Sequence, residues 1–314
     1  MKRIFKFGLA AGLILSAMSF TSCKDEYNEP SSESVNKFDG TRLTSLNDIQ
    51  VSYDESGRVK SLETSYGQTL EFDYSKGTIT CSWGGGDIEV INVNFTKDGY
   101  ISELTSKITE EEPGEYKYSG SGKSKFSYNN MHLIKIEDEW NETEIYPGSK
   151  EKYYEIYKSQ SIFNWKNDNI ISIRNVGSEE YDGEIEKWEN QYSIEYAERD
   201  NIFKQFPISL SSELDLDTGI STDLMGVLAA VGLFGKGPSL LPNYVNYSND
   251  NKSNGSYSIF FDLNDNGSIK KETGRYSYIY RYSEMTRTDF SNDTIVKRFN
   301  FKSFFNRKRH LKNN

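Results

Sequence analysis

The sequence predicts an all-β protein, a long antiparallel meander that is barrel-like or strongly curved, with one buried apolar helix. Three observations predict this fold. A hairpin-like unit recurs along residues 41–296, turns containing glycine separate alternating segments between the copies, and one apolar stretch has helix signals at both ends. The alternating segments are enough for about a dozen strands, in a closed barrel or an open curved sheet.

The repeat is an aromatic or large apolar residue, a turn residue four positions later and a β-branched residue six positions later. In each copy an alternating strand runs into a tight turn and a second strand runs out. Asp98-Gly99 and Asn266-Gly267 are dipeptides that supply the positive φ of hairpin turns. The copies are Tyr53/Gly57/Val59, Phe95/Gly99/Ile101, Trp165/Asn169/Ile171 and Leu263/Gly267/Ile269, with weaker copies at Tyr128/His132/Ile134 and Tyr196/Asp200/Ile202.

A helical insertion at 221–235 separates the last two copies. Ser221 or Thr222 can cap its start, and Gly235 and Gly237-Pro238 can end it. The segment between these signals is apolar almost all round, so we expect the helix to be buried against the concave side of the sheet. A mobile lid and a membrane-touching element are the alternatives.

The N-terminal region resembles that of a bacterial lipoprotein precursor. Residues 1–22 join a cationic start to a short apolar run, the build of a signal peptide. Cys23 follows small residues and resembles the lipobox cysteine that is acylated after cleavage; the alternative is a secreted protein with one stray thiol. Lys24-Asp25-Glu26 resembles the export signal of surface lipoproteins of Bacteroidota. The polar residues 23–40 predict a flexible tether behind the acylated cysteine.

Charge and cysteine content restrict the partners. The chain of 314 residues has 47 acidic and 37 basic residues and a formal net charge of −10, so it repels nucleic acid phosphates. Residues 297–314 contain seven cations and no acid, and we expect them to form a basic C-terminal tail. With Cys23 acylated, Cys81 has no disulfide partner.

No sequence motif indicates a catalytic centre. The two histidines, His132 and His310, argue against a histidine relay or a histidine zinc site. No phosphate-binding loop, dinucleotide fingerprint or HExxH sequence is present. The many acidic residues permit carboxylate pairs of glycosidase spacing, but their abundance singles out no pair. We therefore expect a protein that is not an enzyme and has no cofactor.

Two segments resemble known families. Tyr53 to Val59 is similar to the Tyr-Asp units of RHS-type repeat proteins. Gly232 to Lys236 with Leu241-Pro242 resembles the helix and exit of a Bacteroidota lipoprotein family of unknown function described as porin-like. This resemblance implies a single-sheet, barrel-like β architecture around the helix, and it brings no catalytic residues.

A run of alternating tyrosines is the first candidate binding site. Tyr276, Tyr278, Tyr280 and Tyr282 alternate with other residues, so their rings are expected on one face of one strand. That face either packs against the buried helix or binds sugars or bases by stacking.

A calcium site is the second candidate. Asp262, Asn264 and Asn266 match the start of an EF-hand-type loop, but the twelfth position is Thr273 instead of glutamate. The same residues are common in hairpin turns, and a turn is the preferred interpretation.

The function expected from these patterns is that of a non-catalytic lipoprotein on the outer face of the outer membrane. It would be held by its lipid anchor and would bind a glycan or another extracellular ligand, with no nucleic acid partner. A structural or partner-docking subunit of an outer-membrane complex is the alternative. A glycoside hydrolase is a third hypothesis.

Overall fold

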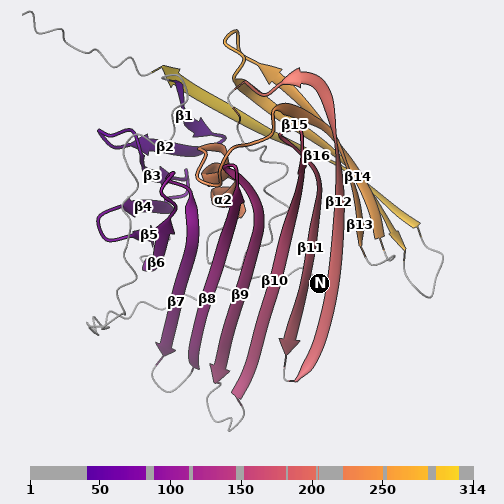
Figure 1. Ribbon diagram of the computed structural model, residues 1–314. Coiled ribbons are helices and arrows are strands. Elements are labelled where there is room, and N and C mark those ends of the chain that lie inside the picture. Colours follow the sequence, from indigo (N-terminus) through magenta and orange to yellow (C-terminus); the bar gives the residue numbers. More distant parts are fainter. Residues whose placement is uncertain are drawn as a thin grey trace, which may run out of the picture.

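The computed structural model describes residues 41–82, 88–112, 116–145, 152–181, 183–202, 204, 222–249, 253–281 and 288–303. Within them, sixteen antiparallel strands follow one another in a single meander (Figure 1). The first six strands, β1 to β6, are short and the other ten are longer. The strands are β1 (Thr41–Leu46), β2 (Ile49–Tyr53), β3 (Val59–Glu63), β4 (Thr69–Asp73), β5 (Thr78–Ser82), β6 (Ile88–Phe95), β7 (Ile101–Glu112), β8 (Tyr116–Asn129), β9 (His132–Ile145), β10 (Lys152–Lys166), β11 (Asn169–Tyr181), β12 (Glu184–Asp200), β13 (Leu240–Asn249), β14 (Ser253–Leu263), β15 (Ile269–Arg281) and β16 (Thr288–Ser303).

The ladder of strands returns to its starting point. β1 pairs with β2 on one side and with β16 on the other, from Leu46↔Phe299 to Thr41↔Ser303. The expectation of a basic tail over 297–314 is therefore wrong for residues 297–303, which belong to the closing strand. A run of cations without acids is typical of a solvated chain end. The unpaired edge of the first strand required a partner, and Phe299 and Phe301 retain the two-residue period of a strand.

The repeat predicted from the sequence is confirmed as a strand–turn–strand unit in five copies. In each of them the pairing register shifts at the aromatic or large apolar residue itself, which is Tyr53, Phe95, Tyr128, Trp165 or Leu263. These residues pair with the first buried residue of the next strand, namely Val59, Ile101, Leu133, Ile170 and Ile269 respectively.

The turn of the Trp165 copy is shorter than the repeat predicts. Asn167-Asp168 has φ values of 51° and 56°, as a two-residue hairpin turn requires. Trp165 consequently pairs with Ile170, whereas Ile171 is 43% exposed. The Tyr128 copy differs from the repeat in the same way.

The aromatic residue of a copy also ties it to the preceding hairpin. In three copies its polar tip donates a hydrogen bond to the backbone carbonyl of the first buried residue in the second strand of that hairpin. This explains why tyrosine and tryptophan suit the position, because a buried aromatic ring with a donor can satisfy a carbonyl at the sheet end. The bonds run from Tyr128 to Ile101 (2.6 Å), from Trp165 to Leu133 (2.7 Å) and from Tyr196 to Ile170 (2.9 Å).

The sixth copy is not a hairpin. β12 continues through Tyr196 to Asp200, and Ile202 is 60% exposed. The next described element is helix α2 (Thr222–Ala230), which is shorter than the predicted insertion. A Schellman motif ends it, because Gly232 has a φ of 84° and donates to Ala229, while Leu233 donates to Leu228. The later glycines therefore lie in the exit segment and not at the cap.

Helix α2 and its exit lie inside the sheet near one end of the long strands, as the buried-helix prediction requires (Figure 1). Met225 and Val227 to Val231 are at most 1% exposed. Phe234 stacks on Phe126 with 5.1 Å between ring centroids, and the Ile101 amide donates to the Leu233 carbonyl. The main core therefore combines the short strands, the helix and one end of the long strands.

Among the described residues, no helix has the length and apolar character needed to cross a membrane.

Candidate functional site

The residues singled out in the sequence fall mainly outside what the structure describes. Cys23 and Lys24-Asp25-Glu26 are not among the described residues. Tyr276, Tyr278 and Tyr280 lie on β15, opposite Tyr257, Gly255 and Ser253 of β14, but only their backbone is described, and Tyr282 lies beyond the described part of the strand. The lipid anchor, the export signal and the tyrosine face remain predictions.

The candidate calcium residues form a hairpin turn between β14 and β15. Asn266 Oδ1 accepts hydrogen bonds from the Ser268 amide (3.1 Å) and hydroxyl (2.7 Å). Asn264 Nδ2 donates to Ser268 Oγ, and Asp262 lies 3.6 Å from the Lys271 ammonium. These contacts use the side chains within the turn. In the described part of the chain, no three His, Cys, Asp or Glu side chains are grouped so that they could hold a metal.

A layer of buried polar side chains lies directly beyond the main core on the inner face of β6 to β11. Each of its members lies two residues beyond a buried apolar residue of its own strand, and each is at most 8% exposed. The layer, called here the inner polar layer, consists of Glu89, Ser106, Ser124, Asp138, Ser161 and Asn175. The inner face therefore changes from apolar to polar within one step along six neighbouring strands.

Two members of the inner polar layer are poorly satisfied within the described structure. Ser124 donates a short hydrogen bond to Asp138, but Glu89 Oε1 and Ser106 Oγ form no hydrogen bond of ordinary geometry. Burial raises the pKa of the Glu89 carboxyl to about 7, an effect that the nearby Ser106 hydroxyl opposes. Buried polar atoms without partners are rare in native proteins, because each costs about 1–3 kcal/mol.

An aromatic cluster follows the inner polar layer farther along the same strands. Trp140 lies directly opposite Tyr157 in the ladder, and the rings of Tyr157 and Trp188 have centroids 6.3 Å apart. Trp140 and Tyr157 are each 6% exposed, and Trp188 is half-buried. We call these three residues the inner aromatic cluster.

Glycines on neighbouring strands make room for the indole rings. A Cβ atom added at Gly122 would lie 2.4 Å from Trp140, and one added at Gly177 would lie 2.2 Å from Trp188. The tryptophans therefore lie flat over the backbone of adjacent strands, an arrangement that only glycine permits.

Acidic side chains surround the inner aromatic cluster. Glu142 Oε2 accepts hydrogen bonds from Trp140 Nε1 (2.8 Å) and from the Tyr118 hydroxyl (2.9 Å). Glu155 lies directly opposite Glu142 in the ladder between β9 and β10. Like charges directly opposite each other destabilise a sheet, and the two hydrogen bonds that Glu142 accepts offset part of that cost.

Sequence patterns do not reveal the inner polar layer or the inner aromatic cluster, because their members come from different strands. Trp140, Tyr157 and Trp188 are separated by 17 and 31 positions, and none is part of a local motif. The available signal was the combination of isolated tryptophans with glycines inside alternating strands. Without the register, however, no glycine could be assigned to a particular tryptophan.

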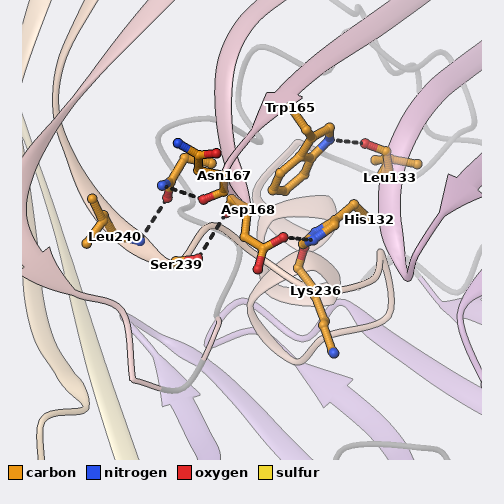
Figure 2. A network of polar contacts seen from close by, with 9 residues as sticks. His132, Leu133, Trp165, Asn167, Asp168, Lys236, Ser239 and Leu240 are labelled. Carbon is orange, nitrogen blue, oxygen red and sulfur yellow. Dashed lines mark hydrogen bonds and ion pairs between the residues drawn. The ribbon is translucent and has the colours of Figure 1, made fainter.

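A second polar network joins two hairpin turns to the exit of α2, as Figure 2 shows. His132 Nδ1 lies 3.2 Å from the Lys236 carbonyl oxygen, and Nε2 lies 3.3 Å from Asp168 Oδ1. The imidazole also stacks on Trp165, with ring centroids 4.1 Å apart. A pocket of about 230 Å³ lies beside these residues.

This network is a structural clamp. Both nitrogens of the His132 ring are engaged, so neither is available to activate a substrate group. The Ser239 amide donates to the Asp168 carbonyl and the Lys236 amide to the Met131 carbonyl, both at 2.8 Å. These contacts fix the segment between α2 and β13 against the turns of two neighbouring hairpins.

Comparison with known proteins identifies similar folds but does not identify a function. No protein-family model and no curated protein matches the chain. A porin-like protein from Bacteroides uniformis ATCC 8492 superposes with a TM-score of 0.51 at 11% identity, covering 85% of this chain and 98% of that one. A porin-like protein from Bacteroides vulgatus ATCC 8482 gives a TM-score of 0.48 at 12% identity, over 82% of this chain and 98% of that one. The first likeness shows a shared porin-like β fold.

Proposed function

We propose that this protein is a non-catalytic, lipid-anchored protein of the bacterial cell surface that binds an extracellular glycan at the inner face of β6 to β12. The observation that carries the proposal is the inner polar layer, in which six polar side chains of neighbouring strands directly follow the apolar core. Stability alone favours apolar residues at buried inward positions, because polar groups are costly to bury without partners. A polar inner face of this kind suits a ligand that carries hydrogen-bonding groups of its own.

The chemistry of the inner face suits a polyhydroxylated ligand. Hydroxyl groups of a sugar both donate and accept, so they can pair with carboxylates, serines and an amide such as Asn175. The flat rings of the inner aromatic cluster suit the apolar faces of pyranose rings, and the half-buried Trp188 offers a partly open surface. An acidic inner face does not suit an anionic ligand.

The outer face of the long strands supports attachment by a lipid anchor. It bears ion pairs at Lys123–Glu103 (2.8 Å), Lys158–Glu139 (3.3 Å) and Arg174–Glu189 (2.7 Å). Strand faces that contact acyl chains are apolar, and lysine or arginine at the bilayer midplane costs about 2–4 kcal/mol. A domain with this outer face stands in water and needs the acyl chains on Cys23 to stay at the membrane.

Hydrolysis is the second candidate, and one observation favours it. Glu142 and Glu155 face each other across adjacent strands of the inner face, and glycoside hydrolysis uses two facing carboxylates. Glu142 is fixed by its two hydrogen bonds to Trp140 and Tyr118. If the protein is a hydrolase, Glu142→Gln abolishes release of reducing sugar.

A glycan array probed with the purified soluble domain tests the proposal. We expect binding of neutral oligosaccharides, with a loss of about tenfold or more for Trp188→Ala, because stacking on aromatic rings contributes strongly to such sites. Tyr154→Ala is the matched control, because Tyr154 is 51% exposed on the outer face of β10, the strand that carries Tyr157. Unchanged binding by folded Trp188→Ala protein would contradict the proposed site.

A further inference from the structure

The ladder between β13 and β14 opens at one end. It runs from Asn249↔Ser253 to Tyr244↔Ser258 and then stops. Beyond that point β13 turns toward β12, with which Pro242 and Leu240 pair. β14 continues to Leu263 and pairs there only with β15.

The open stretch of β14 presents backbone hydrogen-bonding groups. Arg199 Nη1 donates to the Phe261 carbonyl oxygen at 3.0 Å from the β12 side, which shows that this carbonyl points into the opening. In an antiparallel strand the N–H and C=O of one residue point to the same side and alternate residues share that direction. The backbone groups of Phe261 and Ile259 therefore form a strand edge that β13 does not pair with, and Arg199 occupies only the Phe261 carbonyl.

A groove of about 760 Å³ occupies this opening. It is lined by both strands and by the end of β12, and its buried floor includes Leu241 and Ile259. Phe260 forms part of its rim and is 51% exposed, with the Arg275 guanidinium carbon 5.1 Å from the ring centroid. The groove thus combines this strand edge with an apolar floor and an exposed aromatic ring.

The charged residues that line the groove indicate the charge of a complementary ligand. Glu195 and Asp262 are the acidic members, and Arg199 is the only basic one. Arg199 already donates to the Phe261 carbonyl and Asp262 lies 3.6 Å from the Lys271 ammonium, so Glu195 is the acidic lining residue that, among the described residues, has no ion pair. A ligand with a basic side chain complements this lining.

We propose that the groove binds an extended peptide segment of a partner protein, which adds as a strand to the edge of β14 at Ile259 to Leu263. The partner segment alternates apolar residues, which contact Phe260 and the floor, with a basic residue that faces Glu195. Backbone hydrogen bonds to a sheet edge supply affinity in such complexes, and the alternate side chains supply specificity. This site is separate from the inner face and is independent of the proposed glycan binding.

Fluorescence anisotropy with a labelled peptide of sequence Thr-Val-Lys-Val-Thr tests the proposal. We expect saturable binding that weakens about fivefold or more with Phe260→Ala, and that strengthens with Arg199→Ala because the Phe261 carbonyl is released. Ile171→Ala is the control, since Ile171 is 43% exposed outside the groove. Hydrogen exchange of the Phe261 amide is expected to slow in the saturated complex.

Three results would overturn the assignment. The first is equal affinity for a peptide N-methylated at alternate amides, since that peptide lacks the donors that pair with a strand edge. The second is no binding of either peptide at millimolar concentration. The third is sedimentation of the free protein as a dimer that Phe260→Asp dissociates, because a second copy would then fill the groove.

Discussion

Replacing Glu89 by glutamine is expected to stabilise the protein at neutral and alkaline pH. Glu89 is 8% exposed, and burial raises the pKa of its carboxyl from the ordinary value of 4.5 to about 7. The folded protein therefore holds this proton at pH values where the unfolded chain has lost it. Stability contributed by the protonated group is present below about pH 4.5 and is lost as the pH rises through about 7.

The raised pKa sets the size of the effect. Each pKa unit corresponds to about 1.4 kcal/mol, so ionisation of Glu89 costs the folded state up to about 3 kcal/mol above pH 7. Glutamine has nearly the same shape and no charge, so Glu89→Gln avoids this loss. The variant should match the wild type near pH 4.5 and exceed its stability by up to about 3 kcal/mol at pH 8.

Urea unfolding followed by tryptophan fluorescence at pH 5, 6, 7 and 8 measures the difference. Glu71→Gln, at an exposed position on β4, is the control and should show no pH-dependent difference. The lowered pKa values of Asp73 and Glu189, both to about 2, act only at more acidic pH and are common to all three proteins. A stability difference that does not grow between pH 5 and 8 would refute the reasoning.

Further predictions concern the anchor, the helix and the inner wall. Cys23→Ala should abolish incorporation of a fatty-acid probe, and label that persists would contradict the lipoprotein assignment. Alanines at Lys24-Asp25-Glu26 should leave lipidation intact but remove accessibility to external protease on whole cells; equal cleavage would make the segment a mere tether. Leu228→Asp should cost about 4 kcal/mol or more in a thermal melt, because Leu228 is fully buried. Gly177→Ala should cost about 1–3 kcal/mol through contact with Trp188, and the added change Trp188→Leu should restore part of it.

Local patterns in the sequence are sufficient to predict the hairpins and the buried helix. Asp98-Gly99 and the aromatic residue of each copy fix a turn and a register shift within about ten residues, so neighbouring side chains decide the outcome. The helix is predictable because its apolar residues are contiguous. Its C-terminal end is not predictable in the same way, because several glycines follow and any of them could end it. The Schellman contacts show that Gly232, the first of these glycines, ends the helix.

Closure of the sheet was not decided by local sequence. The pairing of β1 with β16 joins residues more than 250 positions apart, and the cations from Lys297 onward concealed the final strand. An unpaired first strand would expose backbone hydrogen-bonding groups at the edge of the sheet. The need for β16 to pair with it becomes apparent only when the whole ladder is assembled.

The repeat unit, the helix, the acidic character and the signal-like N-terminal segment can be recognised in the sequence alone, because each depends on residues that are close along the chain. Which side chains meet inside the sheet depends on how the strands pair. Trp140 rests on Gly122 and Trp188 on Gly177 because of strand register, and a shift of one residue would turn each side chain to the opposite face. The poorly satisfied Glu89 and the open edge of β14 likewise follow from pairing between strands, which no single segment encodes.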